Sequence, residues 1–540
     1  MEIHKSFILN KNKIYFLILC FVISTIIRFL LFPTLGLLQN DDYFYQLISN
    51  NIMNGNGITS DGINPHLHFP PGYPFILGLE KLIIKDPMLR RCLDWSILTG
   101  IVSLFTYVIC NLIQIKRKYL AALICFYTPV YIYGTYTLSI SSETWFSLIG
   151  ALGLIFSINY VNNKKISNLF FANTLFSISY LIRPEGILFY ASTISIIIIE
   201  IIEVKINGGL KRERNPKKVL NISLSFLLPF LIFIFPYLTY LNLYLGRWTL
   251  SGKDQAHEII KASLSESFIE KLIVTIDLFF LSPFFLGLSF SFLTFLIFLK
   301  YFFNKKLNLP NFYGKKFKYF LVLFTPLIPI IYICLKYFPV PRSIYGFIPC
   351  IIPLLLMFFE STDPKAISKK KTFLDSKRSF SEKFDFLNIS ILLILTFNLI
   401  VPLFLLDSND IWINNPKLYN ETIDLFKNDL IANKKPLIYS RNFNIAVDNS
   451  EFDICNEFPE DWILFEEHKK LNCSNRNVDY LFLSNLNHLS LIPFQPPSWE
   501  LSAIDKEKFY YKNQLCSQIS KIYAKNKKTK VIVFKCDNKV

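Results

Sequence analysis

The regular alternation of long uncharged apolar runs with short basic segments constrains this chain more than any other feature. Runs of about 20 residues with almost no charge recur through residues 1–406, and each is long enough to cross a ~30 Å hydrocarbon core. The mean hydropathy is +0.37, and 54 of the 540 residues are phenylalanine, far above ordinary usage in soluble domains. We therefore expect an all-α polytopic membrane protein over residues 1–406.

The pattern predicts about eleven membrane-spanning helices. They are expected near residues 14–33, 92–115, 119–138, 143–161, 168–182, 187–204, 219–244, 281–303, 318–338, 343–360 and 386–406. No small-residue cleavage site follows the first run, so we expect an uncleaved signal anchor that starts in the cytoplasm.

The net charge of +17 is a signal of membrane topology and does not indicate nucleic-acid binding. Residues 407–540 hold 18 basic and 18 acidic side chains, so the whole excess lies in residues 1–406, where 39 basic side chains face 22 acidic ones. The basic side chains cluster in the short segments 116–118, 164–165, 211–218, 315–318 and 369–383. The positive-inside rule makes these segments cytoplasmic. The N-terminus is then expected inside, and an odd number of spans places the tail outside.

The first outer loop, residues 34–91, is expected to be ordered and to hold interfacial helices. Residues 42–53 carry apolar side chains at helical spacing, which predicts an amphipathic helix on the membrane surface. Residues 73–84 predict a second one, with Pro74 near its start. A similar stretch, 265–280, precedes the eighth span.

Residues 407–540 are expected to form a soluble extracytoplasmic α/β or α+β domain. The short apolar runs 436–439, 480–483 and 530–534 predict strands. Four cysteines, Cys455, Cys473, Cys516 and Cys536, lie here. An even number in an oxidising compartment suggests two disulfides, although three pairings are possible.

Asp41 and Asp42 follow the first span directly. Carboxylates at the end of a span are costly unless they have a function. One interpretation is structural, an N-cap and a favourable first-turn acid for the following helix. The other is catalytic, a general base for an acceptor and a ligand for a divalent cation.

His66 and His68 are the other candidate metal ligands, and with Asp42 they are the residues we predict for a divalent cation such as Mg²⁺ or Mn²⁺. Exposed loop histidines without a metal are the alternative. The following segment, 69–74, contains Pro70-Pro71-Gly72 and predicts a rigid turn that holds the loop in place.

Five further charged residues sit at expected outer ends of spans or in outer loops. Glu143 follows two serines and suits either an N-terminal helix position or a substrate site, while Arg183 and Glu185 either pair with each other or bind substrate. Lys253, in the Ser251-Gly252-Lys253 loop, and Arg342 are the candidate phosphate contacts. For Arg342 the alternative is an interfacial arginine that extends its head group to water.

Taken in order, these segments resemble the GT-C glycosyltransferases, specifically the bacterial branch akin to protein O-mannosyltransferases and the lipid A aminoarabinose transferase. The resemblance covers about residues 10–360. It rests on the acid pair, the Pro-Pro-Gly-Tyr-Pro turn, the Arg-Pro-Glu-Gly hairpin, the Ser-Gly-Lys loop and the late Arg before a Pro-rich span. Relatives often have Lys or Arg before Pro-Pro, where this chain has Phe69. In relatives a Tyr follows the late Arg, whereas here Ser343 follows and Tyr345 comes two residues later.

The resemblance implies an enzyme of the bacterial cytoplasmic membrane that transfers one hexose or pentose from a polyprenyl-phosphate carrier, usually with inversion. The acceptor would be a lipid, a glycan or a protein. It also implies that the key acid is Asp41 or Asp42. We expect substrate contacts from Glu143, Arg183, Glu185, Lys253, Arg342 and Tyr345.

The residues themselves suit this chemistry. Cleavage of a sugar–phosphate bond needs a carboxylate near the acceptor hydroxyl and cations near the leaving phosphate. A lipid-linked donor needs no nucleotide-sugar domain, and no βαβ pattern is visible. Two other functions are open: a transporter or flippase for a lipid-linked saccharide, which would place polar groups at the bilayer midplane, and a polysaccharide polymerase.

Overall fold

The computed structural model describes part of the chain, and all statements about structure concern that part. The described residues are 11–35, 40–60, 62–116, 118–127, 141–207, 216–252, 315–329, 346–361, 437–440, 453–455, 473, 477–484, 503, 506–523 and 530–537.

Apolar helices make up most of the described chain. Three are long and apolar enough to cross a membrane, Leu89–Leu112, Ser142–Asn163 and Leu220–Leu245, and three shorter ones are similarly apolar, Ile14–Leu30, Ile166–Ile182 and Ile348–Met357. The helices are α1 (Lys11–Leu35), α2 (Asn40–Met53), α3 (Gly72–Ile83), α4 (Pro87–Leu93), α5 (Thr99–Leu112), α6 (Lys118–Phe126), α8 (Ser141–Asn163), α9 (Ile166–Ile182), α10 (Tyr190–Asn207), α11 (Pro216–Pro229), α12 (Phe235–Leu245), α16 (Lys315–Phe324) and α19 (Ile348–Ser361).

Six of these apolar helices coincide with predicted spans, so the prediction of a membrane protein with several apolar spans holds. The predicted spans 281–303 and 386–406 and the interfacial stretch 265–280 lie outside the described residues, as do parts of 119–138 and 318–338. The span count and the orientation of the termini therefore stay predictions.

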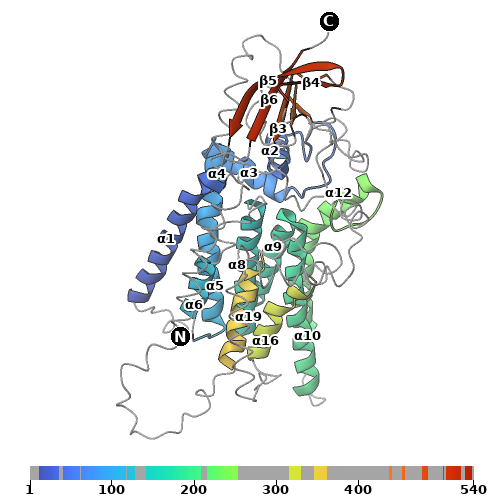
Figure 1. Cartoon of the computed structure of the whole chain (residues 1–540). Helices are drawn as coiled ribbons and strands as arrows, with labels where there is room; N and C mark the ends of the chain where they lie inside the picture. Colours follow the sequence, from blue (N-terminus) through green and yellow to red (C-terminus); the bar gives the residue numbers. More distant parts are fainter. Residues whose placement is uncertain are drawn as a thin grey trace, which may run out of the picture.

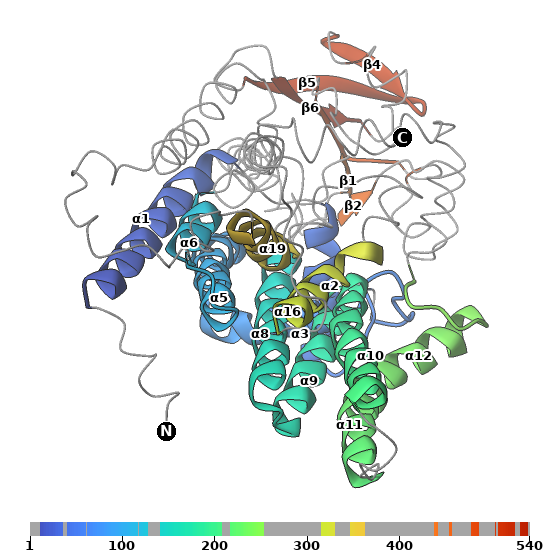
Figure 2. The same cartoon turned by 90° about the horizontal axis from the view of Figure 1, so that it is seen from below.

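The long helices form a bundle with α8 inside it (Figures 1 and 2). Viewed along the bundle, α1, α5 and α6 lie on one side and α9 to α12 on the other (Figure 2). The apolar window of Ser142–Asn163 is 72% buried, whereas that of Leu220–Leu245 is 33% buried. The first is therefore central, and the second presents an apolar face outward, as a lipid-facing helix would.

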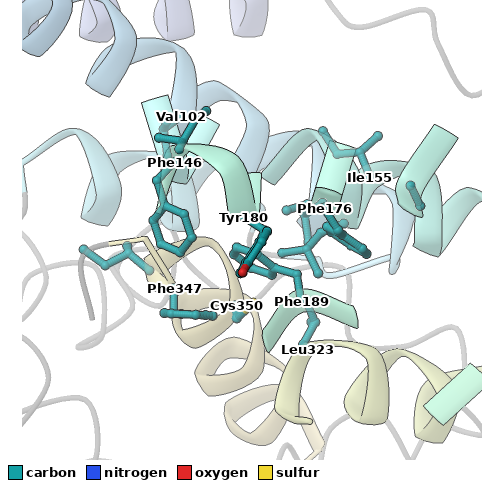
Figure 3. Close-up of a cluster of buried hydrophobic side chains, with 14 of the residues drawn as sticks. Val102, Phe146, Ile155, Phe176, Tyr180, Phe189, Leu323, Phe347 and Cys350 are labelled. Carbon is teal, nitrogen blue, oxygen red and sulfur yellow. The ribbon is translucent and has the colours of Figure 1, made fainter. Parts of the chain in front are cut away.

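Aromatic rings fill the interior between α8, α9 and α19. Phe146, Phe176, Phe189 and Phe347 are each at most 1% exposed, and the Phe189 ring lies 4.8 Å from that of Phe347 and 5.5 Å from that of Phe176. Tyr180 lies in the same cluster (Figure 3). Interdigitated rings at these distances make a close-packed core.

Prolines lie at or just beyond the ends of two helices, α11 and α16, and side chains of neighbouring helices bind the carbonyls left without a donor. Pro229 has no N–H, so the carbonyl of Ser225 lacks its usual partner. The Asn173 amide donates to that carbonyl at 3.0 Å. In the same way, Pro326 leaves the carbonyl of Val322 unpaired, and the Ser192 hydroxyl donates to it at 2.6 Å.

A buried arginine attaches α1 to the bundle. Arg28 is 0% exposed, and its guanidinium donates to the carbonyl of Ser96 at 3.1 Å and to that of Phe126 at 3.4 Å. Ser96 lies in a π-helical turn, Asp94–Leu98, between α4 and α5, and Phe126 ends α6. Carbonyls at such irregular positions need a hydrogen-bond donor in an apolar interior. This need explains why a charged residue, Arg28, is buried there.

Helices α2 and α3 confirm two predicted helices of the first outer loop, within two residues of the predicted boundaries. Phe44, Tyr45 and Ile48 of α2 are buried, as are Tyr73 and Leu77 of α3. Both helices lie across one end of the bundle, which we call the capping end (Figure 1).

The C-terminal part contains a six-stranded mixed sheet in the order β2-β1-β3-β6-β5-β4. The strands are β1 (Leu437–Ser440), β2 (Asp453–Cys455), β3 (Tyr480–Ser484), β4 (Lys508–Tyr511), β5 (Gln514–Tyr523) and β6 (Lys530–Cys536). β1 pairs in parallel with β2 and β3, and the remaining pairs are antiparallel. The predicted strands correspond to β1, β3 and β6. The sheet lies at the capping end (Figure 1), while the predicted domain boundary at 407 lies outside the described residues.

Two disulfides join the four cysteines of this region, as predicted. The pairing, which the sequence leaves open, is Cys455 with Cys473 and Cys516 with Cys536. The second pair lies at directly opposed positions of β5 and β6.

Candidate functional site

Segments that are far apart in the sequence meet at the capping end. They are α2, the loop 54–71, the start of α3, the first turn of α8, the end of α9 with the turn after it, and the segment 246–252. Most of the predicted site residues lie on or directly beside these segments.

Arg183 is directed toward α8 because a proline follows it. Pro184 disfavours a helical conformation for the preceding residue, and Arg183 accordingly has an extended backbone with φ −147° and ψ 138°. The helix α9 therefore ends at Ile182, and the 3₁₀ turn Pro184–Phe189 begins. This geometry brings the Arg183 guanidinium to the first turn of α8.

The Arg183 guanidinium forms hydrogen bonds or ion pairs with three side chains, two of which, Glu143 and Glu185, are predicted site residues. Arg183 Nη1 donates to the Ser142 hydroxyl at 3.1 Å and to Glu143 Oε1, and Nη2 donates to Glu185 Oε1 at 2.8 Å. The Ser142 hydroxyl in turn donates to Glu143 Oε2 at 2.9 Å. The structure thus brings Glu143, Arg183 and Glu185 together, and Arg183 and Glu185 do pair.

The cluster is buried and carries one more negative than positive charge. The side chains of Arg183 and Glu143 are 7% and 2% exposed, whereas that of Glu185 is 20% exposed. Glu143 lies in the first turn of α8, where the helix dipole favours a carboxylate. Glu185 is therefore the carboxylate that an incoming molecule can reach, and Arg183 holds it in place.

Two glycines allow the loops to approach the helices closely. A Cβ on Gly72 would lie 2.6 Å from the carbonyl oxygen of Leu181, and one on Gly252 would lie 1.8 Å from that of Leu67. Any larger residue at these positions would separate the chains. Tyr240 also fixes the first loop, because its hydroxyl lies 3.2 Å from the carbonyl oxygen of Ile58 and 3.1 Å from that of His66.

Asp41 and Asp42 lie in the first turn of α2. Their side chains are outside the description, so only their place on the helix is known. Tyr45 lies one turn further along the same helix. Tyr45 interacts electrostatically with Arg183, and its ring lies 4.5 Å from that of Phe69. Helix α2, which carries Asp41 and Asp42 in its first turn, thus approaches the Arg183 cluster through Tyr45.

His66 and His68 both pack on Phe69. The His66 ring stacks on it at 5.4 Å, and the His68 ring meets it edge-on at 4.7 Å. Among the described residues, no three His, Cys, Asp or Glu side chains gather as a metal site would require. The divalent-cation site with Asp42 stays a prediction, and no step below uses a metal.

Lys253, Arg342 and Tyr345 lie outside the described residues. The described chain reaches Gly252 on one side, and it resumes at Gly346 on the other. Gly346 packs against Phe146, which lies one turn after Glu143. The structure therefore places only the described ends next to these residues, Gly252 against Leu67 of the first loop and Gly346 against Phe146 of α8.

A second charged cluster was not expected from the sequence. Trp145 Nε1 donates to Glu80 Oε1 at 3.0 Å, and Arg90 Nη2 donates to Gln46 Oε1 at 3.1 Å. Asp94 lies beside Glu80. Burial, aided by the neighbouring Asp94 carboxylate, raises the pKa of Glu80 to about 8. Its members come from positions between 46 and 145 of the sequence, so no local sequence pattern indicates such a cluster.

Comparisons with solved structures establish the fold. The structure matches the crystal structure of ArnT from Cupriavidus metallidurans bound to undecaprenyl phosphate with a TM-score of 0.54 and 11% identity, over 96% of this chain and 97% of that one. The apo oligosaccharyltransferase of Archaeoglobus fulgidus matches with a TM-score of 0.43 and 11% identity, over 87% of this chain and 69% of that one. No family model and no curated protein matches the sequence. The ArnT match confirms the GT-C fold expected from the sequence.

Proposed function

We propose that this chain is an integral-membrane glycosyltransferase that moves a sugar from a polyprenyl-phosphate carrier to a lipid, glycan or protein acceptor. We propose that the reaction takes place on the outer face of the bacterial cytoplasmic membrane. The observation that carries the proposal is the buried Glu143–Arg183–Glu185 cluster, which lies at the end of the bundle where the acid-bearing helix α2 also lies. The ArnT-like fold supports it, and so does the undecaprenyl phosphate bound to that ArnT.

The proposed reaction is a single displacement at the anomeric carbon. The acceptor hydroxyl oxygen forms a bond to that carbon from the face opposite the phosphate, and the bond between the carbon and the phosphate oxygen breaks. The polyprenyl phosphate leaves with the electron pair, so the configuration inverts. Asp41 or Asp42 accepts the proton of the acceptor hydroxyl, as a general base does in inverting glycoside chemistry.

The remaining charged residues have roles that follow from their chemistry. The developing charge on the leaving phosphate needs cations, and we assign these to Lys253 and Arg342, with Tyr345 as a hydrogen-bond donor. Glu185, the more exposed carboxylate of the cluster, is assigned to a sugar hydroxyl. Arg183 and Glu143 hold Glu185 in position.

The test uses the full chain in proteoliposomes with a panel of radiolabelled polyprenyl-phosphate hexoses and pentoses. Release of the sugar from one carrier, with the label recovered on an acceptor or in water, is the expected result. A transporter would instead move the intact labelled lipid across the bilayer without cleavage. A polymerase would leave single-sugar carriers intact and extend only longer lipid-linked repeats. Either of these results would contradict the proposal.

A further inference from the structure

Tyrosines from three helices converge beside the Arg183 cluster, and no sequence motif marked them. Tyr237 of α12 lies near Tyr180 of α9, Tyr45 of α2 and Tyr240 of its own helix. Its ring lies 6.1 Å from that of Tyr180 and 6.2 Å from that of Tyr240. Tyr180 precedes Arg183 by three residues on α9, and Tyr45 interacts with Arg183. The tyrosine group therefore adjoins the proposed site.

The Tyr237 hydroxyl differs from those of its neighbours. The Tyr180 hydroxyl donates to the carbonyl of Leu250 at 2.7 Å, and the Tyr240 hydroxyl lies within hydrogen-bond distance of two carbonyls of the first loop. Tyr237 is 4% exposed, and within the described part of the chain its buried hydroxyl has no hydrogen-bond partner. A buried hydroxyl without a partner is costly, and a native structure normally supplies one.

We infer that the Tyr237 hydroxyl binds a hydroxyl group of the transferred sugar, with the rings of Tyr45 and Tyr180 beside it. This inference rests on the proposed function. Sugars combine apolar C–H faces with many hydroxyls, and sites for such ligands pair aromatic surfaces with a few placed polar groups. A tyrosine supplies both an apolar ring and a hydroxyl that donates and accepts. Glu185 of the adjoining Arg183 cluster would provide a second polar contact to the sugar.

The inference predicts an unusual combination of effects for Tyr237→Phe in the full-length protein. The substitution removes only the hydroxyl, so the ligand-free protein keeps its apparent Tm or gains stability. Binding of a sugar-bearing carrier weakens about three- to tenfold, as the loss of one hydrogen bond would produce. Binding of bare undecaprenyl phosphate, which has no sugar, is unchanged.

The experiment measures the apparent Tm of wild type and Tyr237→Phe alone, with undecaprenyl phosphate, and with undecaprenyl-phosphate-linked hexose or pentose. Tyr180→Phe is the matched control for stability, because its hydroxyl has a short hydrogen bond within the chain, and its Tm should fall. A fall of equal size for Tyr237→Phe would mean that the chain itself satisfies this hydroxyl, which overturns the inference. A sugar-dependent Tm increase in Tyr237→Phe as large as that of wild type, at sugar-carrier concentrations below saturation, would overturn it as well.

The same measurements separate this inference from the proposed function. If wild type cleaves a carrier but Tyr237→Phe binds it normally, the function stands and the inference fails. If wild type neither binds nor cleaves any sugar-bearing carrier, the proposed function fails and the assignment of Tyr237 to a sugar falls with it.

Discussion

Arg183 bridges two carboxylates, one of them deeply buried, and the cost of replacing it follows from that burial. Its partner Glu143 has a side chain that is 2% exposed, so removing the guanidinium would leave a buried, uncompensated carboxylate. Such a loss costs about 3–5 kcal/mol. Exposed ion pairs, in contrast, contribute about 1 kcal/mol or less.

We therefore predict that Arg183→Ala lowers the apparent Tm strongly and abolishes sugar transfer. Arg183→Lys keeps the charge but cannot bridge both carboxylates, so it should lower the Tm less while still reducing transfer at least tenfold. Lys164→Ala is the control, because Lys164 is 39% exposed in its 2.6 Å pair with Glu200. Thermal unfolding in detergent measures all three. Equal Tm values for Arg183→Ala and Lys164→Ala would contradict this account of the cluster.

The residues of this cluster could be predicted from the sequence, but not all of their contacts with one another could. Glu143, Arg183 and Glu185 were all identified as candidates because charges at span ends are costly. The sequence left open whether Arg183 and Glu185 only pair with each other. It could not show that Arg183 also binds Glu143, since that contact depends on how α8 and α9 pack. The tyrosines were missed because a tyrosine inside an apolar run resembles ordinary core.

At the level of helices, polar side chains link neighbouring helices by donating to carbonyls that a proline leaves without an N–H partner. Asn173 and Ser192 each donate across a helix interface to a backbone carbonyl. That carbonyl lacks its usual N–H partner because the residue four positions later is a proline. The amphipathic pattern predicts the helices but not these bonds, because each donor is 52 or 130 residues from its acceptor.

This arrangement predicts coupling between Asn173 and Pro229. Asn173→Ala should destabilise the wild type by about 1 kcal/mol, since it leaves the Ser225 carbonyl unpaired. In a Pro229→Ala background the helix supplies its own N–H, so the same substitution should cost clearly less. A double-mutant cycle in denaturant measures the difference. Strictly additive effects would show that the Asn173 bond does not compensate for Pro229.

The contact between α3 and α8 should depend on pH. Burial, aided by Asp94, raises the pKa of Glu80 from 4.5 to about 8, while the Trp145 hydrogen bond and Arg90 act in the opposite direction. Between these values the folded protein holds a proton that the unfolded chain has released, so the contribution of Glu80 to stability falls as pH rises. Glu80→Gln keeps an acceptor for Trp145 and removes the titration.

We expect Glu80→Gln and wild type to have similar apparent Tm values near about pH 4.5 and to diverge up to about pH 8, with wild type becoming the less stable protein. Thermal unfolding across this range measures the difference. A constant difference between the two proteins over the whole range would contradict the assignment of this titration to Glu80.

At the level of the whole molecule, the sequence predicted the helical and the C-terminal parts with unequal success. The apolar runs are long and periodic, so the helices and their approximate boundaries follow from them. In the C-terminal part β2 has three residues, too few for a pattern. β4 and β5 are joined by Lys512 and Asn513 at positive φ, and only the asparagine signals a hairpin turn.

The disulfides give a prediction for this part. Peptide mapping of the unreduced protein should recover Cys455 linked to Cys473 and Cys516 linked to Cys536. The bonds join positions 18 and 20 residues apart, so each should stabilise the sheet by about 3 kcal/mol in the loop-entropy model. Replacing both Cys516 and Cys536 by serine should therefore increase proteolysis of the C-terminal part. Recovery of a different pairing would show that the strand register is wrong.

The central claim is that the capping end of this bundle transfers a sugar with a carboxylate of α2 as the base. The most direct measurement is the initial rate of sugar transfer from the active polyprenyl-phosphate donor, compared for wild type, Asp41→Asn and Asp42→Asn. Asp86→Asn is the control, because Asp86 is an exposed acid that accepts a hydrogen bond from the Leu89 N–H at the start of α4. We predict a loss of roughly 100-fold or more in at least one of the two site variants, with donor binding and Tm retained and with the control unaffected. Full transfer by both variants would contradict the account.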